Sequence, residues 1–290
     1  MNSTIPKVIH YCWFGGKPLP KLALKCIESW KYFCPDFEIR EWNESNFDIH
    51  CCRYVSQAYE RKRWAFVSDY ARFKILYDYG GIYFDTDVEL IKPIDDLIDK
   101  GSFMGAEPGV SAIPGLGLAA APGLGLYREI IDYYEDVSFV DELGEDIVLD
   151  TVVTRTTRIL KEHGYKGNGT VEKICDIYIY PPEYFCPKNF RTGELQITDN
   201  TRSIHHYTAS WLTEREKKLS DIELWVGKRF GEITRTRLKK NSFWIFVSSL
   251  YKVGARRTMI KTLNRICTKF KTGGVNSRQY ISVYSLGGVA

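Results

Sequence analysis

The sequence predicts an α/β fold built on a parallel sheet, and three observations near its beginning support this. The stretch VIHYCWF, residues 8–14, is β-branched and aromatic, as buried strands are. A glycine pair and a segment with helical apolar spacing follow it, and the strand-like stretch FEIREW comes next. This order favours a βαβ unit, in which the two strands lie parallel.

The remaining elements follow from hydrophobic periodicity. Residues 20–33 have the apolar spacing of an amphipathic helix, and residues 37–42 form the second strand. The stretch WAFVSDYARFKILYDYGG, residues 64–81, has the same helical period and ends at a glycine pair that suits a helix C-terminus. Residues 80–90 form the strand that follows it. Further strands are predicted at 102–106, 116–121, 175–180 and 203–207, and further helices at 124–134, 146–163 and 213–230.

Composition indicates an ordinary folded protein of a reducing compartment. The 290 residues, 44% of them hydrophobic, suffice for one large core. The eight cysteines contain no CxxC pair and no spacing typical of zinc. No secretory leader is recognisable in MNSTIPKVIHYCWFGG. We therefore predict a cytoplasmic protein.

The charge is divided unevenly along the chain. Residues 228–278 hold fourteen Lys or Arg and one Glu, so the rest of the chain holds 26 bases and 35 acids. We predict two regions, a catalytic domain over 1–227 and a basic, partly amphipathic extension over 228–290. The apolar run near 242–250 is too short to span a bilayer, but the extension could lie on an anionic membrane surface. A helix packed on the domain explains the pattern equally well, and no recognised motif indicates nucleic acid.

Acids alternate at the end of the strand predicted at 80–90, GGIYFDTDVEL. On one extended strand Asp85, Asp87 and Glu89 would share a face and repel one another. A hard divalent cation such as Mg²⁺ or Mn²⁺ would relieve this repulsion and leave coordination positions for phosphate oxygens. The alternative is a group of acids where a strand enters a solvated loop.

Residues before and after these acids in the sequence favour a metal site over a group of solvated acids. Asp69 and Arg72 are three apart on the preceding helix, so they can share a face near the acids, where a guanidinium could bind phosphate. The alternative is a surface ion pair. His205 and His206 end another predicted strand, and an imidazole ligand would favour Mn²⁺ over Mg²⁺. The sequence does not decide which of the two histidines points inward.

Several blocks of this sequence resemble the DXD glycosyltransferases of family 32. The blocks are IPKVIHYCWFGG, FVSDYARFKILYDYGGIYFDTDVEL, TVVTRTTRILKEHG and YPPEYFCPKNF with the later IHHYTASW, and together they cover about residues 5–213. The closest likeness is to bacterial enzymes that build capsular or lipopolysaccharide glycans. The catalytic domains of glucosylating toxins are more distantly similar.

The resemblance implies a fold, a reaction and a set of ligands. The fold would be of GT-A type, a single nucleotide-binding α/β domain with a mixed central sheet, here with a helical basic extension. The reaction would be hexosyl transfer from a nucleotide-sugar, a UDP-sugar, with Mn²⁺ or Mg²⁺ and with retention of anomeric configuration. The acceptor would be a glycan or a lipid-linked oligosaccharide.

The resemblance also assigns roles to residues. It implies a catalytic set of Asp69, Arg72, Asp85 and Asp87, in which Asp69 and Arg72 contact the donor sugar and diphosphate and Asp85 orients ribose and sugar. Asp87 would bind the metal directly, with His205 and Asp85 beside it.

Four further residues would complete the nucleotide site. The resemblance places Ile9 and Trp13 at the nucleotide, with Trp13 stacked on uracil. Ser210 and Trp211 would close over the diphosphate.

Two other functions are weighed against this one. GLGLAA, residues 115–120, fits a dinucleotide fingerprint, but Pro114 precedes it and Pro122 interrupts any helix after it, so an oxidoreductase is disfavoured. A membrane-associated protein that binds nucleotide-sugar or glycan without turnover is the second alternative. It would lack the groups that assist the leaving diphosphate, and those groups are present here.

Overall fold

The computed structural model describes residues 4–107, 111–112, 114–141, 151–190, 193–208, 214–241, 244–245 and 247–248. The chain divides into two compact units, Met1–Trp211 and Leu212–Ala290. The boundary predicted at 227/228 lies within helix α8, Glu214–Phe230, of the second unit. Every residue assigned above to catalysis, nucleotide or metal belongs to the first unit.

The first unit is built on a mixed central sheet. Its strands are β1 (Val8–Cys12), β2 (Glu38–Trp42), β3 (Gly81–Tyr83), β5 (Phe103–Glu107), β6 (Ser111–Ala112), β7 (Leu118–Ala120), β8 (Glu172–Ile174) and β9 (Ile177–Tyr180). Their order is β2-β1-β3-β7-β5-β9-β8, with β6 beside β5. β1 pairs in parallel with β2 and β3, and β5 with β9, while β7 is antiparallel to both of its neighbours. The predicted α/β class with a mixed sheet is confirmed.

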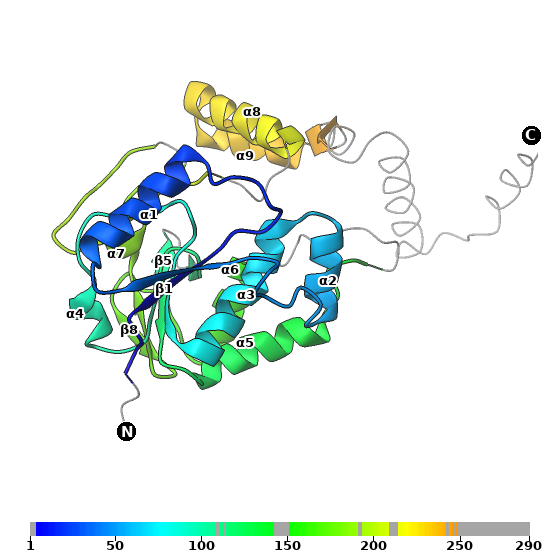
Figure 1. The fold of residues 1–290 in the computed structure, drawn as a ribbon. Coiled ribbons are helices and arrows are strands. Elements are labelled where there is room, and N and C mark those ends of the chain that lie inside the picture. The colour runs from blue at the N-terminus through cyan, green and yellow to red at the C-terminus, as the bar shows by residue number, and fades with distance from the viewer. Residues whose placement is uncertain are drawn as a thin grey trace, which may run out of the picture. The chain divides into compact units, whose positions relative to one another are not determined.

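Helices cover both faces of this sheet, with α1 on one face and α3 and α5 on the other (Figure 1). The helices of the first unit are α1 (Lys21–Phe33), α2 (Arg53–Glu60), α3 (Trp64–Tyr79), α4 (Asp95–Ile98), α5 (Gly125–Asp136), α6 (Val152–Glu162) and α7 (Pro182–Phe185). Alternate side chains of each strand point to opposite faces. Ile9 and Phe103 accordingly pack in the core on the α1 side, and Cys12 and Met104 in the core on the α3 side.

A buried histidine joins three elements at the start of the fold. His10 is fully buried on β1; its Nδ1 accepts a hydrogen bond from Trp42 Nε1 at 3.0 Å, and its Nε2 lies 3.0 Å from the Gly80 carbonyl oxygen. Since Nδ1 accepts, Nε2 carries the proton and donates to Gly80. Burial lowers the pKa of His10 to about 4, so the ring is neutral. This histidine is structural and ties β2 and the end of α3 to β1.

The strand predicted over 80–90 is in fact two strands, which corrects the expectation that its acids share a face. β3 ends at Tyr83, and β4 (Val88–Leu90) begins after a turn closed by the hydrogen bond from Val88 N to Asp85 O, 3.0 Å. β4 leaves the central sheet and pairs antiparallel with β10 (Ser203–His205) in a separate two-stranded sheet. The alternation of side chains between two faces therefore does not continue through the turn, and the acids on its two sides do not belong to one strand face.

Other elements agree with the prediction to within a few residues, apart from short ones. The sequence did not predict α2, α4, α7, β6, β8 or α9 (Glu232–Lys240), and the strand predicted at 175–180 corresponds to β9. Residues 146–150 of the helix predicted at 146–163 lie outside the described residues. Among the described residues, no helix combines the length and the apolarity that crossing a membrane requires.

Candidate active site

Three charged side chains of the first unit form a group at the end of β3, in which Arg72 and Asp69 are buried and Asp85 is partly exposed. Arg72, on α3, has a side chain only 4% exposed, and its Nη2 lies 3.0 Å from Asp69 Oδ1 and 3.3 Å from Asp85 Oδ1. Its Nε donates to the Ser68 carbonyl oxygen at 3.0 Å, and the guanidinium lies over the Tyr83 ring. The Tyr83 hydroxyl donates to Asp85 Oδ1 at 3.2 Å. The predicted proximity of Asp69 and Arg72 to the acids is present, and the pair is buried rather than on the surface.

Burial and neighbouring charges set the ionisation of this group. Burial raises the pKa of Asp69 to about 6, although Arg72 attracts its charged form. Burial alone would lower the pKa of Arg72, but the surrounding anions, Asp85 first, raise it above its usual range. Arg72 therefore stays cationic between two carboxylates, one of which titrates near neutrality.

A second pair forms where β10 meets the turn before β4. His205 Nε2 lies 3.3 Å from Asp87 Oδ1, and Asp87 Oδ2 accepts hydrogen bonds from Thr208 N at 2.8 Å and Thr208 Oγ1 at 2.9 Å. Burial favours the protonated form of Asp87, but the interactions with His205 and then Thr208 outweigh it and hold its pKa well below the usual range. Asp87 is therefore an anion already oriented by two partners.

The structure separates the two adjacent histidines. His205 faces Asp87, whereas His206 Nε2 lies 2.8 Å from Glu89 Oε2, which also binds Lys25 Nζ at 2.9 Å. Glu89 therefore belongs to a separate ion-pair group and is not a third acid beside Asp85 and Asp87.

A glycine completes the surroundings of Asp85. Gly115 precedes β7, and its carbonyl oxygen accepts a hydrogen bond from Asp85 N at 3.0 Å. A Cβ atom at this position would overlap the Asp85 carboxylate and lie 3.1 Å from Arg72 Nη1. The Asp85 carboxylate can thus occupy its place only because residue 115 has no side chain. GLGLAA forms a turn and strand here and no helix start, as the sequence predicted.

The residues assigned to the nucleotide have different positions. Trp13 follows β1 directly, is partly exposed, and donates from its indole to the Lys17 carbonyl oxygen. Ile9 is fully buried in the core between the sheet and α1, which leaves its side chain no access to a ligand. Ser210 and Trp211 lie outside the described residues.

The side chains present fit a hard divalent cation in part. Asp87 Oδ1 and His205 Nε2 face each other, and an oxygen with a nitrogen donor suits Mn²⁺. The His205 Nδ1 atom is buried without a hydrogen-bond partner in the described part of the chain, and the ring contacts Asp87 through Nε2 and also the Tyr207 ring, whose centroid lies 4.1 Å away. Within that part, no three His, Cys, Asp or Glu side chains form a metal-binding cluster. Among the described residues, Asp87 and His205 are the two side chains that could bind such a cation here, and the Asp85 carboxylate is turned toward Arg72.

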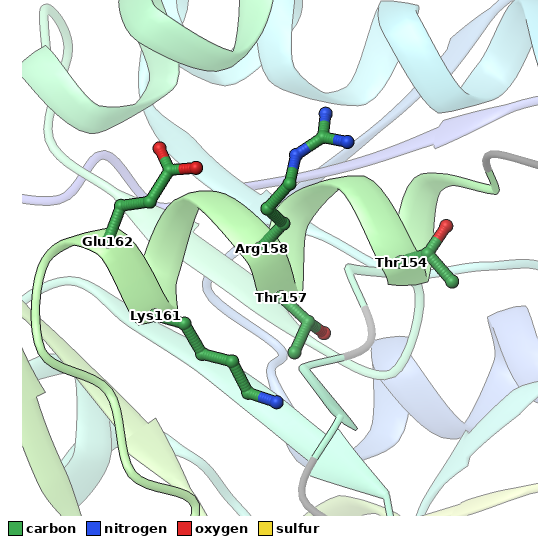
Figure 2. A pocket seen from close by; sticks show the side chains of 5 residues that line it. All are labelled: Thr154, Thr157, Arg158, Lys161 and Glu162. Carbon is green, nitrogen blue, oxygen red and sulfur yellow. The ribbon is translucent and has the colours of Figure 1, made fainter.

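A shallow, open depression in the surface lies apart from these groups. It measures about 520 Å³ and is lined by five residues of α6 alone (Figure 2): Thr154, Thr157, Arg158, Lys161 and Glu162. It contains neither the acids nor His205, so its volume does not identify it with the site described above.

Comparison with known sequences places the acids in a recognised region. Residues 20–104 match the model of the family described as "Glycosyltransferase sugar-binding region containing DXD motif". This stretch runs from α1 to β5 and contains Asp69, Arg72, Asp85 and Asp87. The mixed central sheet is consistent with a GT-A type fold.

The relatives are similar over part of their length. "Inositol phosphoceramide mannosyltransferase 1" of Schizosaccharomyces pombe is 29% identical over 111 residues, 34% of this chain and 33% of the relative. "Inositol phosphoceramide mannosyltransferase 3" of the same organism is 30% identical over 105 residues, 33% of this chain and 28% of the relative. The match thus spans about a third of these relatives. The solved structure "PaToxG Glycosyltransferase" has a TM-score of 0.44 at 18% identity, covering 55% of this chain and 69% of that one. This likeness is too distant to bear on function.

Sequence reasoning missed three residues of the site. Tyr83 holds Asp85, Thr208 holds Asp87, and Gly115 leaves room for the Asp85 carboxylate. Tyr83 stands two residues before Asp85, a spacing that could have suggested a contact. Thr208 and Gly115 gave no local signal, because their contacts depend on tertiary structure.

Proposed function

We propose that the protein is a metal-dependent glycosyltransferase that moves a sugar from a nucleotide-sugar to a glycan or lipid-linked acceptor. One observation carries this proposal: in the stretch that matches the DXD family, Arg72 is buried between Asp69 and Asp85, next to the turn that presents Asp87 to His205. Ionisable side chains whose pKa values are shifted by burial and by neighbouring charges are typical of active sites. Transfer proceeds with retention, by analogy with the resembling family.

Each group has a role in this proposal. Asp87 and His205 would hold the divalent cation, which would supply positive charge near the diphosphate. Asp85 accepts hydrogen bonds from ribose and sugar hydroxyls while Arg72 fixes its carboxylate. Arg72 also adds positive charge near the diphosphate, and Trp13 offers an aromatic face to the base.

The identities of the donor and the acceptor are inferred from similarity to other proteins. The resemblance favours a UDP-sugar and synthesis of capsule, lipopolysaccharide or exopolysaccharide at the cytoplasmic face of the membrane. Two relatives are named "Inositol phosphoceramide mannosyltransferase". A mannose donor and a lipid acceptor should therefore be tested as well.

Release of nucleoside diphosphate from a panel of UDP- and GDP-sugars tests the proposal. Wild-type protein with Mn²⁺ should hydrolyse one donor slowly, EDTA should abolish this, and Asp87→Asn should reduce it at least ~100-fold because the metal loses its anionic ligand. Asp132→Asn, at an exposed ion pair on α5, is the matched control and should behave as wild type. Unchanged Mn²⁺-dependent turnover in Asp87→Asn contradicts the assignment. Metal-dependent donor binding without turnover, with or without added acceptors, favours the non-catalytic alternative.

We also propose that the basic extension brings the enzyme to an anionic membrane. Support comes from the charge of residues 228–278 and from α9, whose last turn contains Arg237, Lys239 and Lys240. Residues 251–290 lie outside the described part of the chain. Deleting residues 241–290 should weaken partition onto vesicles containing phosphatidylserine at least ~10-fold, since each surface base contributes ~1 kcal/mol. Vesicles of neutral lipid serve as control, and equal partition of both proteins on anionic vesicles argues against the proposal.

A further inference from the structure

A small pocket lies where β5 and β9 end. Its lining consists of strand ends and one turn: Ala106, Glu107, Tyr165, Gly167, Gly169, Thr170, Ile179, Pro181 and Pro182. Its volume is about 100 Å³, below the ~300–1,000 Å³ of pockets for drug-sized ligands. The pocket therefore suits one small group, such as part of a single sugar ring.

The pocket and the acids share one edge of the central sheet. β7 runs antiparallel to both β3 and β5, so β3 and β5 point the same way, and β9 is parallel to β5. The carboxyl ends of these three strands consequently meet at one edge, where ligands bind in open α/β sheets. Asp85 follows β3, and Glu107 is the last residue of β5.

One wall of the pocket is held rigidly. The Glu172 carboxylate accepts hydrogen bonds from three successive backbone N–H groups, those of Lys166, Gly167 and Asn168, at 2.9, 2.7 and 3.2 Å. Asn168 Oδ1 in turn accepts from Thr170 N at 3.0 Å. The turn is thus fixed before any ligand arrives, which reduces the entropy lost on binding.

Glu107 is the charged residue of this pocket, and its carboxylate has no ion pair or hydrogen bond within the described residues. The other acids near this edge, Asp69, Asp87 and Glu89, all have such partners. Burial raises the pKa of Glu107, and attraction from His205 counteracts this in part. Solvent reaches the Glu107 carboxylate, which is only partly buried, so a ligand that enters the pocket would take the place of water as the hydrogen-bond donor.

We propose that this pocket is a sugar subsite in which the Glu107 carboxylate accepts hydrogen bonds from pyranose hydroxyl groups. The inference rests on the proposed function and extends it to a residue without an assigned role. An anionic occupant such as phosphate would be repelled by Glu107, and the lining offers no second acid for a cation. A neutral polyol supplies the donors that the carboxylate lacks.

The hydroxyls could belong to the donor sugar or to the acceptor, and two measurements on Glu107→Gln separate these sources. The first is donor hydrolysis without acceptor. The second is saturation-transfer NMR with methyl α-glucoside, galactoside and mannoside in the presence of Mg²⁺ and nucleoside diphosphate. Glu183→Gln is the matched control, because Glu183 stands beside Pro182 but accepts its hydrogen bonds from Asn200 and Thr198.

Because Glu107→Gln removes hydrogen bonds to a charged group, we expect either the hydrolysis kcat/KM or the affinity for the glycoside to fall ~10–100-fold. A fall in hydrolysis kcat/KM, with unchanged affinity for the nucleoside diphosphate, identifies the donor sugar. Unchanged hydrolysis with loss of the glycoside signal identifies the acceptor. Glu107→Gln indistinguishable from Glu183→Gln in both measurements overturns the subsite. If wild-type protein hydrolyses no donor, the proposed enzyme fails, whereas the glycoside measurement still decides whether the pocket binds sugar.

Discussion

Replacing Arg72 with methionine should lower the free energy of unfolding by about 3–5 kcal/mol at pH 8 and abolish donor hydrolysis. The guanidinium is the cation shared by Asp69 and Asp85, and removing one partner of a buried ion pair leaves an uncompensated charge. Urea denaturation measures the first effect, and nucleoside diphosphate release the second. Arg128→Met is the control, because Arg128 pairs with Asp132 and Glu135 at the surface, where ion pairs contribute ~0–1 kcal/mol.

The stability penalty of Arg72→Met should depend on pH. The pKa of Asp69 is raised from 3.8 to about 6 in the folded protein, so its contribution to stability is full below pH 4 and is lost as the pH rises through 6. Without Arg72 this pKa rises further. At pH 5 Asp69 is mostly protonated in both proteins, and the difference between them should shrink. A penalty equal at pH 5 and pH 8 would show that Asp69 does not depend on Arg72.

Gly115→Ala should reduce donor hydrolysis ~100-fold while changing the free energy of unfolding by less than about 2 kcal/mol. The new methyl group displaces the Asp85 carboxylate, and misplacing a group that positions the substrate by ~1 Å costs about that factor. The carboxylate is partly exposed and can turn toward solvent, so the fold should tolerate the change.

Two other glycines provide controls for this prediction. A Cβ at Gly125 meets open space, so Gly125→Ala should alter neither property. A Cβ at Gly117 would lie 3.2 Å from Phe185 and 3.3 Å from Phe84, so Gly117→Ala should affect stability more than turnover per folded molecule. Wild-type hydrolysis by Gly115→Ala would remove Asp85 from the proposed machinery.

The sequence was sufficient for elements with a long, regular pattern. β1, α1 and α3 were predicted because apolar side chains repeat at strand or helix spacing over many residues. The short helices α2 and α4 were not, since eight and four residues establish little periodicity. The break between β3 and β4 was missed because acidic residues stand at every second position on both sides of the turn. The sequence pattern therefore continues through the turn without interruption.

The site was predictable where partners lie close in sequence. Asp69 and Arg72 are one helical turn apart, and their pairing follows from that spacing alone. The choice of His205 over His206 depends on the register of β10 against β4, in which His205 lies opposite Val88. Gly115 and Glu107 gain their significance only from strand order, which no local pattern specifies.

The division of the DXD stretch between two sheets makes the site depend on distant parts of the chain. Asp85 is fixed from the central sheet, whereas Asp87 is fixed by His205 and Thr208, more than a hundred residues later. A fragment confined to residues 20–104 would contain both acids but not the partners that orient Asp87. The family signature therefore contains only part of the proposed site, and the two acids acquire their final geometry only once the middle of the first unit has assembled with its C-terminal part.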